Sequence, residues 1–151
     1  MRILLATFLA FALVASTACN ESHKLSQANY DFAVGLKAAA HVLASYHDKG
    51  SISDADYNAI LDVEIQVVKS HAELVTQLSA LGQIDPTNKD AVLVYVDSVS
   101  RSIAKLNDAG VLHLKSTQAQ ADFKLAVSSL QSAIVVARAL IAGISKPVAV
   151  K

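Results

Sequence analysis

The sequence predicts an all-α protein, an antiparallel up-down four-helix bundle that follows an N-terminal signal peptide. Three observations lead to this prediction. Hydrophobic residues make up 53% of the 151 residues but aromatic residues only 5%, and a chain rich in alanine and poor in Gly and Pro favours helix. Four segments repeat apolar residues with the period of a helix. The connections between these segments are short, which favours antiparallel neighbours.

The first 18 residues have the order of a secretory signal. Arg2 is followed by the apolar run 3–14 and then by small residues directly before Cys19, which is the charged, apolar, small-residue sequence of a cleaved leader. The run is shorter than the roughly 20 residues that cross a bilayer as a helix. We therefore predict a signal peptide at 1–18 and a single helical-bundle domain at 19–151, which is long enough for one core.

The cleavage region resembles the lipobox of bacterial lipoproteins, in which a small residue precedes a cysteine that becomes acylated. Ala18-Cys19 fits this pattern, and Cys19 is the one cysteine of the chain. The resemblance implies lipidation of Cys19, the membrane as partner through that lipid, and a place in the cell envelope. Asn20 after the cysteine favours the outer membrane over the inner membrane by the enterobacterial rule, and the protein would then face the periplasm.

The lipobox pattern is imperfect at Ser16, where the family usually has Leu. Ser16-Thr17-Ala18 also suits ordinary signal peptidase, so a soluble secreted or periplasmic protein is the alternative. We expect about five residues between Cys19 and the first helix. A lipid on Cys19 would then hold the bundle against the bilayer surface, where two acyl chains anchor a protein stably.

Apolar stripes predict where the four helices lie. Residues spaced by three and four recur within Phe32–Tyr46, Ile60–Leu81, Val92–Leu106 and Ala119–Leu140, and this spacing places them on one face of each helix. Cap and turn residues separate the segments. Gly50 and Gly110 are expected just past helix ends, Ser53 or Asp54 to cap the second helix, Asp85-Pro86 to begin the third, and Pro147 to end the fourth.

Glu64 and His71 are ionisable residues near the centre of the second apolar stripe, where burial is deepest. They lie seven residues apart, or about 10 Å along a helix, too far for a direct hydrogen bond. One interpretation is a structural network in which both side chains have hydrogen-bond partners, or a position at the solvent-exposed edge of the bundle. Another is a polar pocket that binds a small ligand at Glu64 and His71.

The sequence contains none of the common motifs for metal binding or catalysis. The chain has no ExxH, HExxH or CxxC pattern, and no GxSxG, GxGxxG or P-loop. Thirteen basic and thirteen acidic residues balance, so the basic field of a nucleic-acid binder is missing. We therefore predict no catalytic residues, no metal, no cofactor and no nucleic-acid partner.

The fourth helix is apolar on nearly all sides from 133 to 144, where Arg138 is the one charge. Leu125 and Val136 point away from its stripe. Either loops cover this helix, or it packs on another copy, a protein partner or the membrane. The sequence thus predicts an exported, lipid-anchored cell-envelope protein with a non-enzymatic binding or structural role, and as the alternative a soluble periplasmic bundle that holds a small ligand.

Overall fold

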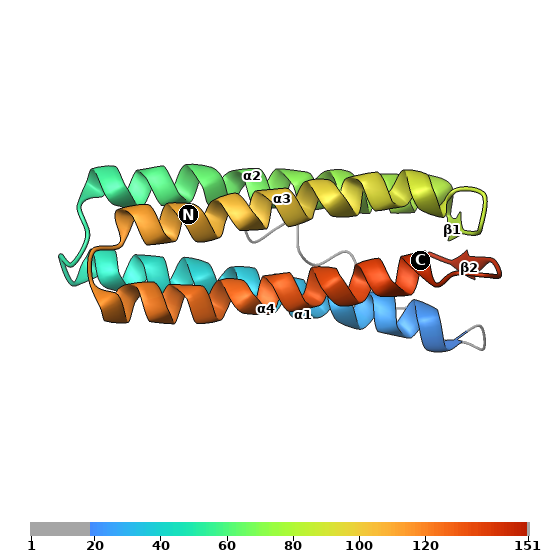
Figure 1. Cartoon of the computed structure of the whole chain (residues 1–151), viewed down its shortest axis with the longest axis horizontal. Coiled ribbons are helices and arrows are strands. Elements are labelled where there is room, and N and C mark those ends of the chain that lie inside the picture. Colours follow the sequence, from blue (N-terminus) through green and yellow to red (C-terminus); the bar gives the residue numbers. More distant parts are fainter. Residues whose placement is uncertain (1–18, 151) are drawn as a thin grey trace.

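The computed structural model describes residues 19–150 as a four-helix bundle (Figure 1). The helices are α1 (Cys19–Asp48), α2 (Asp54–Leu81), α3 (Lys89–His113) and α4 (Thr117–Ala142). Two short strands, β1 (Gln83–Ile84) and β2 (Val148–Ala149), follow α2 and α4. The predicted all-α four-helix bundle is confirmed. The signal peptide predicted for 1–18 lies outside the described residues.

The helices form two layers, α1 with α4 and α2 with α3, as Figure 1 shows. The layers are joined mainly through α3 and α4, whereas the other neighbouring pair across the layers, α1 and α2, is in much less contact. At one end β1 and β2 pair in antiparallel fashion, with Ile84 opposite Val148. We call the boundary between the two loosely packed helices the α1/α2 seam.

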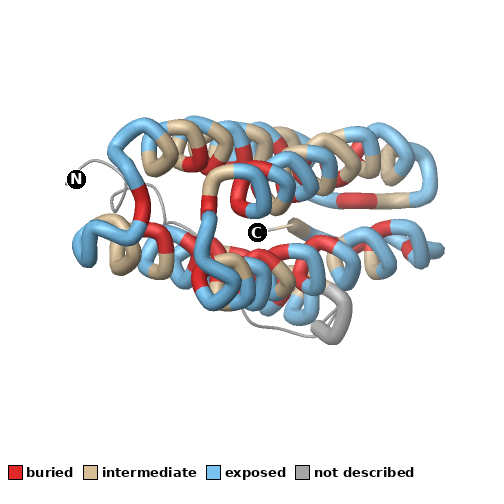
Figure 2. The backbone as a smooth tube through the Cα atoms, turned by 60° about the vertical axis from the view of Figure 1, so that its left-hand side comes forward, coloured by how far each residue is buried: buried red, intermediate tan, exposed pale blue. Residues whose placement is uncertain are grey.

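The core runs along the length of the bundle on the inward faces of all four helices (Figure 2). Its largest fully buried side chains come from every helix, because each contributes the apolar stripe that its spacing predicts. Members of this core are Phe32 and Leu43 of α1, Ile60 and Val67 of α2, Ile103 and Leu106 of α3, and Phe123 and Leu130 of α4.

Two predicted helix starts are wrong. α1 begins at Cys19 itself, so the expected five-residue spacer after the cysteine does not exist. α3 begins at Lys89 rather than at Asp85-Pro86. The Asp85 carboxylate accepts hydrogen bonds from the backbone N–H groups of Thr87 at 2.8 Å and Asn88 at 3.2 Å, and this side-chain turn competes with helix formation.

The predicted turn residues between α1 and α2 are confirmed. Gly50 has a φ of 67°, a conformation that glycine adopts without strain. Ser53 is the N-cap of α2, and its hydroxyl accepts a hydrogen bond from the backbone N–H of Asp56 at 3.1 Å. Gly110, expected beyond the end of α3, lies inside that helix, which continues to His113.

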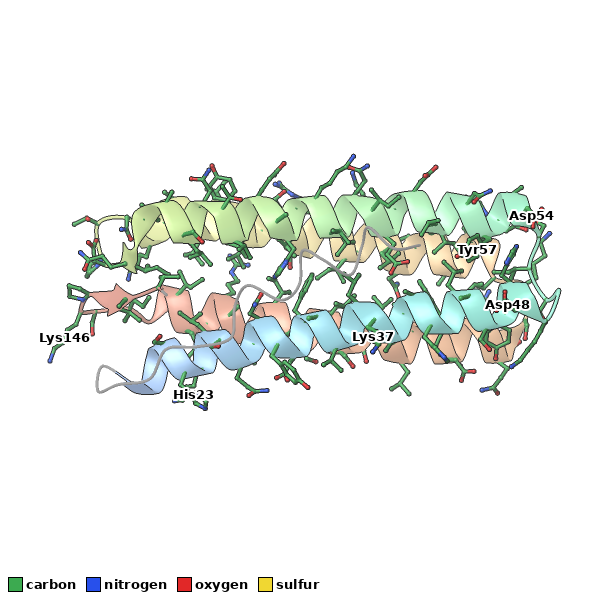
Figure 3. All side chains as sticks on the ribbon, turned by 180° about the vertical axis from the view of Figure 1, so that it is seen from behind. His23, Lys37, Asp48, Asp54, Tyr57 and Lys146 are labelled. Carbon is green, nitrogen blue, oxygen red and sulfur yellow. The ribbon has the colours of Figure 1, made fainter. Side chains whose placement is uncertain are left out.

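Histidine–carboxylate pairs fasten the end of the bundle opposite the strands. His47 Nε2 lies 2.8 Å from Asp54 Oδ1, and His113 Nδ1 lies 2.9 Å from Asp56 Oδ1. The ring of His47 also stacks on Tyr57, with ring centroids 4.3 Å apart. Figure 3 shows Asp54 and Tyr57 at this end and His23 and Lys146 at the other. The His47–Asp54 pair therefore joins α1 to α2 at this end of the α1/α2 seam.

Candidate ligand-binding site

A cavity opens at the strand end of the bundle, between the first half of α1 and the second halves of α2 and α4. Its lining on α1 runs from Ser22 to Phe32, about 15 Å along the helix axis. Its volume is about 70 Å³. Since one water needs roughly 10–15 Å³ of such space, the cavity has room for a slender molecule larger than a single water.

The inner wall of the cavity is apolar and buried. Phe32, Leu74 and Ile134 supply large side chains, while Ala133 and Ala137 of α4 are small and leave the space open. No lining residue carries a full charge; the lining has no Asp, Glu, Lys or Arg. The wall therefore suits an apolar molecule, whose burial is favoured by about 25 cal/mol per Å².

The rim of the cavity on α1 is polar. Ser22, Ser26 and Asn29 recur at spacings of four and three, so they share one face of the helix. Ser26 is exposed, and Ser22 and Asn29 are half-buried. These residues mark the side on which the cavity meets solvent and supply hydrogen-bonding groups there.

His71 lines the cavity from α2. Its imidazole stacks on the ring of Phe32, with centroids 4.2 Å apart and planes inclined by 8°. Burial lowers the pKa of His71 to about 4, because a low-dielectric surrounding disfavours the charged form. The imidazole is therefore neutral at neutral pH, with one nitrogen that donates and one that accepts a hydrogen bond.

Glu64 is buried in the core, with 5% of its surface exposed. Its Oε2 has no hydrogen-bond partner within residues 19–150, so the satisfied network considered from the sequence does not form around this atom. Burial raises the pKa of Glu64 to about 7, because the uncharged carboxyl avoids the cost of desolvating a carboxylate.

The structure does not bring Glu64 and His71 into one site. Both lie on the side of α2 that faces α1, in a row spaced by seven residues that begins at Tyr57. Tyr57 stacks on His47 and His71 stacks on Phe32, so Glu64 lies between these two contacts along α2. Glu64 is thus about 10 Å from His71 along the axis of α2, and it does not line the cavity.

Cys19, the predicted lipidation site, is the first residue of α1. It precedes Ser22 at the rim of the cavity by about one helical turn. In the part of the chain that the structure describes, no three His, Cys, Asp or Glu side chains are grouped so that they hold a metal ion.

The outer face of α4 exposes several large apolar side chains, as its sequence predicts. Leu125, Val135 and Val136 are exposed, while Arg138 forms an ion pair with Asp97 of α3 at 3.2 Å. By length and composition α4 is apolar enough to cross a membrane, and 33% of its most apolar window is buried inside the bundle. A partner for this face stays a prediction.

Sequence reasoning identified His71 but missed the other half of its surroundings. The apolar spacing places Phe32 on the core stripe of the first helix, and nothing in the linear sequence indicates that its ring meets an imidazole from the second. The alanines of α4 that leave the cavity open give no sign of it in the sequence either, since alanine is common on any helix. The chain matches no protein-family model, no curated protein and no solved structure at a level that would show a relationship.

Proposed function

We propose that this protein is exported to the cell envelope, is anchored there by a lipid on Cys19, and binds a small, largely apolar molecule without catalysing a reaction. The observation that carries the proposal is the cavity between α1, α2 and α4, with its buried apolar wall and its polar rim. Pockets for small ligands combine an apolar lining with a few polar groups in this way.

The position of the cavity supports a ligand that comes from the lipid phase. Ser22 at its rim lies about one turn of α1 from Cys19. An acylated Cys19 would hold that end of the bundle near the bilayer surface, where apolar molecules are concentrated. The order of charge, apolar run and small residues in 1–18 supports export.

The separation of the buried Glu64 from the half-buried His71 supports binding rather than catalysis. General acid–base chemistry needs groups within about 3 Å of the proton that they transfer. His71 alone lines the cavity, and Glu64 is about 10 Å away along α2. The alternative function is ligand binding by the same bundle as a soluble periplasmic protein.

Filling the cavity tests the ligand proposal. Ala137 lines the cavity, whereas Ala139, two residues along α4, is exposed. Native mass spectrometry of the gently purified protein should show a bound apolar species. We expect Ala137→Phe to lose that species and Ala139→Phe, the matched control, to retain it. Retention in both variants, or a ligand-free wild type that also binds no added alkane or alkanol, would refute the proposal.

The lipid anchor is tested separately by the intact mass of the protein from the membrane fraction. We expect a mass increase of at least two acyl chains on a chain that begins at Cys19, and its loss in Cys19→Ser. A Cys19→Ser protein that is still processed and still membrane-bound would contradict the anchor. A soluble wild type that begins at Cys19 without acylation would select the periplasmic alternative.

A further inference from the structure

His71 has a fixed orientation but no hydrogen-bond partner. The parallel stack on Phe32 uses the face of the imidazole, which leaves the two nitrogens at the ring edge free to bond. His47 and His113 each contact a carboxylate oxygen, whereas no hydrogen bond joins His71 to another side chain described between residues 22 and 150. The nitrogens of His71 are not among the buried side-chain atoms that lack a partner, and the residue is half-buried, so its ring edge is accessible from the cavity and a ligand can bond there in place of water.

The surroundings of His71 exclude a charged ligand. The lining includes no Asp, Glu, Lys or Arg, so an ammonium or a carboxylate in the cavity would lose its hydration without a counter-ion. His71 itself is neutral at neutral pH, because burial lowers its pKa to about 4. The nearest buried carboxyl, that of Glu64, has its pKa raised to about 7 and does not reach the lining.

The shape of the cavity limits the rest of the ligand. About 15 Å of α1 borders a volume of about 70 Å³, so the lining is extended along the helix axis. Asn29 lines the cavity on the polar edge of α1 and offers both a donor and an acceptor. A flexible aliphatic chain can follow such an extended lining.

We propose that the cavity selects an uncharged aliphatic molecule with a hydroxyl head, and that the ring edge of His71 forms the hydrogen bond to that head. This inference rests on the proposed ligand-binding function and names the class of its ligand. His71 is the residue that determines specificity. The apolar wall of Leu74, Ala133 and Ile134 contacts the chain of the ligand.

Four eight-carbon probes separate the head group from the chain: 1-octanol, octylamine, octanoate and n-octane, titrated calorimetrically into the purified protein at pH 7. We expect octanol to bind at least tenfold more tightly than octylamine or octanoate, because both are ionised. We expect octane to bind about fivefold more weakly than octanol, since one net hydrogen bond is missing.

The variant His71→Phe keeps a ring for the stack on Phe32 and removes the nitrogens. We expect this variant to bind octanol about fivefold more weakly than the wild type and to bind octane with unchanged affinity. A merely structural role of His71 would weaken the binding of both probes. His41→Phe, at an exposed histidine of α1, is the control. Tighter binding of a charged probe, or equal octanol affinity in His71→Phe, overturns the inference while the cavity function stands. Failure of all four probes to bind overturns both.

Discussion

Gly110 of α3 lies directly against the ring of Phe123 in α4, in the interior of both helices. A Cβ added at Gly110 would meet Phe123 Cε1 at 2.6 Å, closer than real Cβ contacts allow. Phe123 is 1% exposed, so its ring is enclosed in the core. The missing side chain at Gly110 is therefore what lets α3 and α4 approach each other at this level.

Gly110→Ala should destabilise the protein by up to about 2 kcal/mol. Alanine is favoured over glycine in a helix by about 1 kcal/mol, but overpacking a filled core costs about 1–3 kcal/mol, and we expect the clash to exceed the gain. Urea unfolding checks this. The double variant Gly110→Ala/Phe123→Leu should lose less than the sum of the single variants. Additive losses would show that the two residues are not coupled.

Glu64→Gln should make the protein less sensitive to alkaline pH. The folded-state pKa of Glu64, about 7, lies above its ordinary value of 4.5, so its contribution to stability is full below pH 4.5 and is lost as the pH rises through 7. The shift corresponds to about 3 kcal/mol at most. Urea unfolding of variant and wild type at pH 5 and pH 8 measures the difference.

The control for Glu64→Gln is Glu73→Gln, at an exposed glutamate of the same helix. We expect the stability of this control to follow the wild type at both pH values. If Glu64→Gln gains nothing relative to the wild type between pH 5 and pH 8, then Glu64 is not buried as an uncharged carboxyl.

His71→Phe should protect the protein against acid. The folded-state pKa of His71, about 4, lies below its ordinary value of 6.5, so its contribution to stability is full above pH 6.5 and is lost as the pH falls through 4. The stability of the variant relative to the wild type should therefore rise by up to about 3 kcal/mol over that range. Urea midpoints from pH 7 to pH 4 provide the test, and a constant difference would contradict it.

Ser53→Ala should destabilise the protein by about 1 kcal/mol. Ser53 Oγ accepts the hydrogen bond of the Asp56 N–H and donates to Asp56 Oδ2 at 2.7 Å, and loss of such a cap typically costs this much. Thermal unfolding should show a lower Tm. The control Ser51→Ala, in the same exposed loop, should leave the Tm unchanged. If both variants lower the Tm equally, the loss of stability comes from the loop and not from the helix cap.

The sequence by itself determined the helical fold, because the apolar period of each segment requires a partner face and short loops leave one antiparallel arrangement. It also located Glu64 on the buried stripe of its helix and Ser53 at a helix start, since both follow from local spacing and side-chain chemistry. Gly110 shows what local sequence patterns do not determine. Its local pattern was typical of a helix end, but the ring of a residue thirteen positions later occupies the space that its side chain would need.

The tertiary structure alone decided which residues form the cavity. Phe32, His71 and Ala137 come from three helices, and their meeting depends on the axial register between α1, α2 and α4. The apolar period fixes which face of a helix is inward but not how far one helix slides along another, since a shift by one turn presents a similar stripe. That register separates Glu64 from the cavity and places His71 in it, with an imidazole edge that no neighbouring residue satisfies.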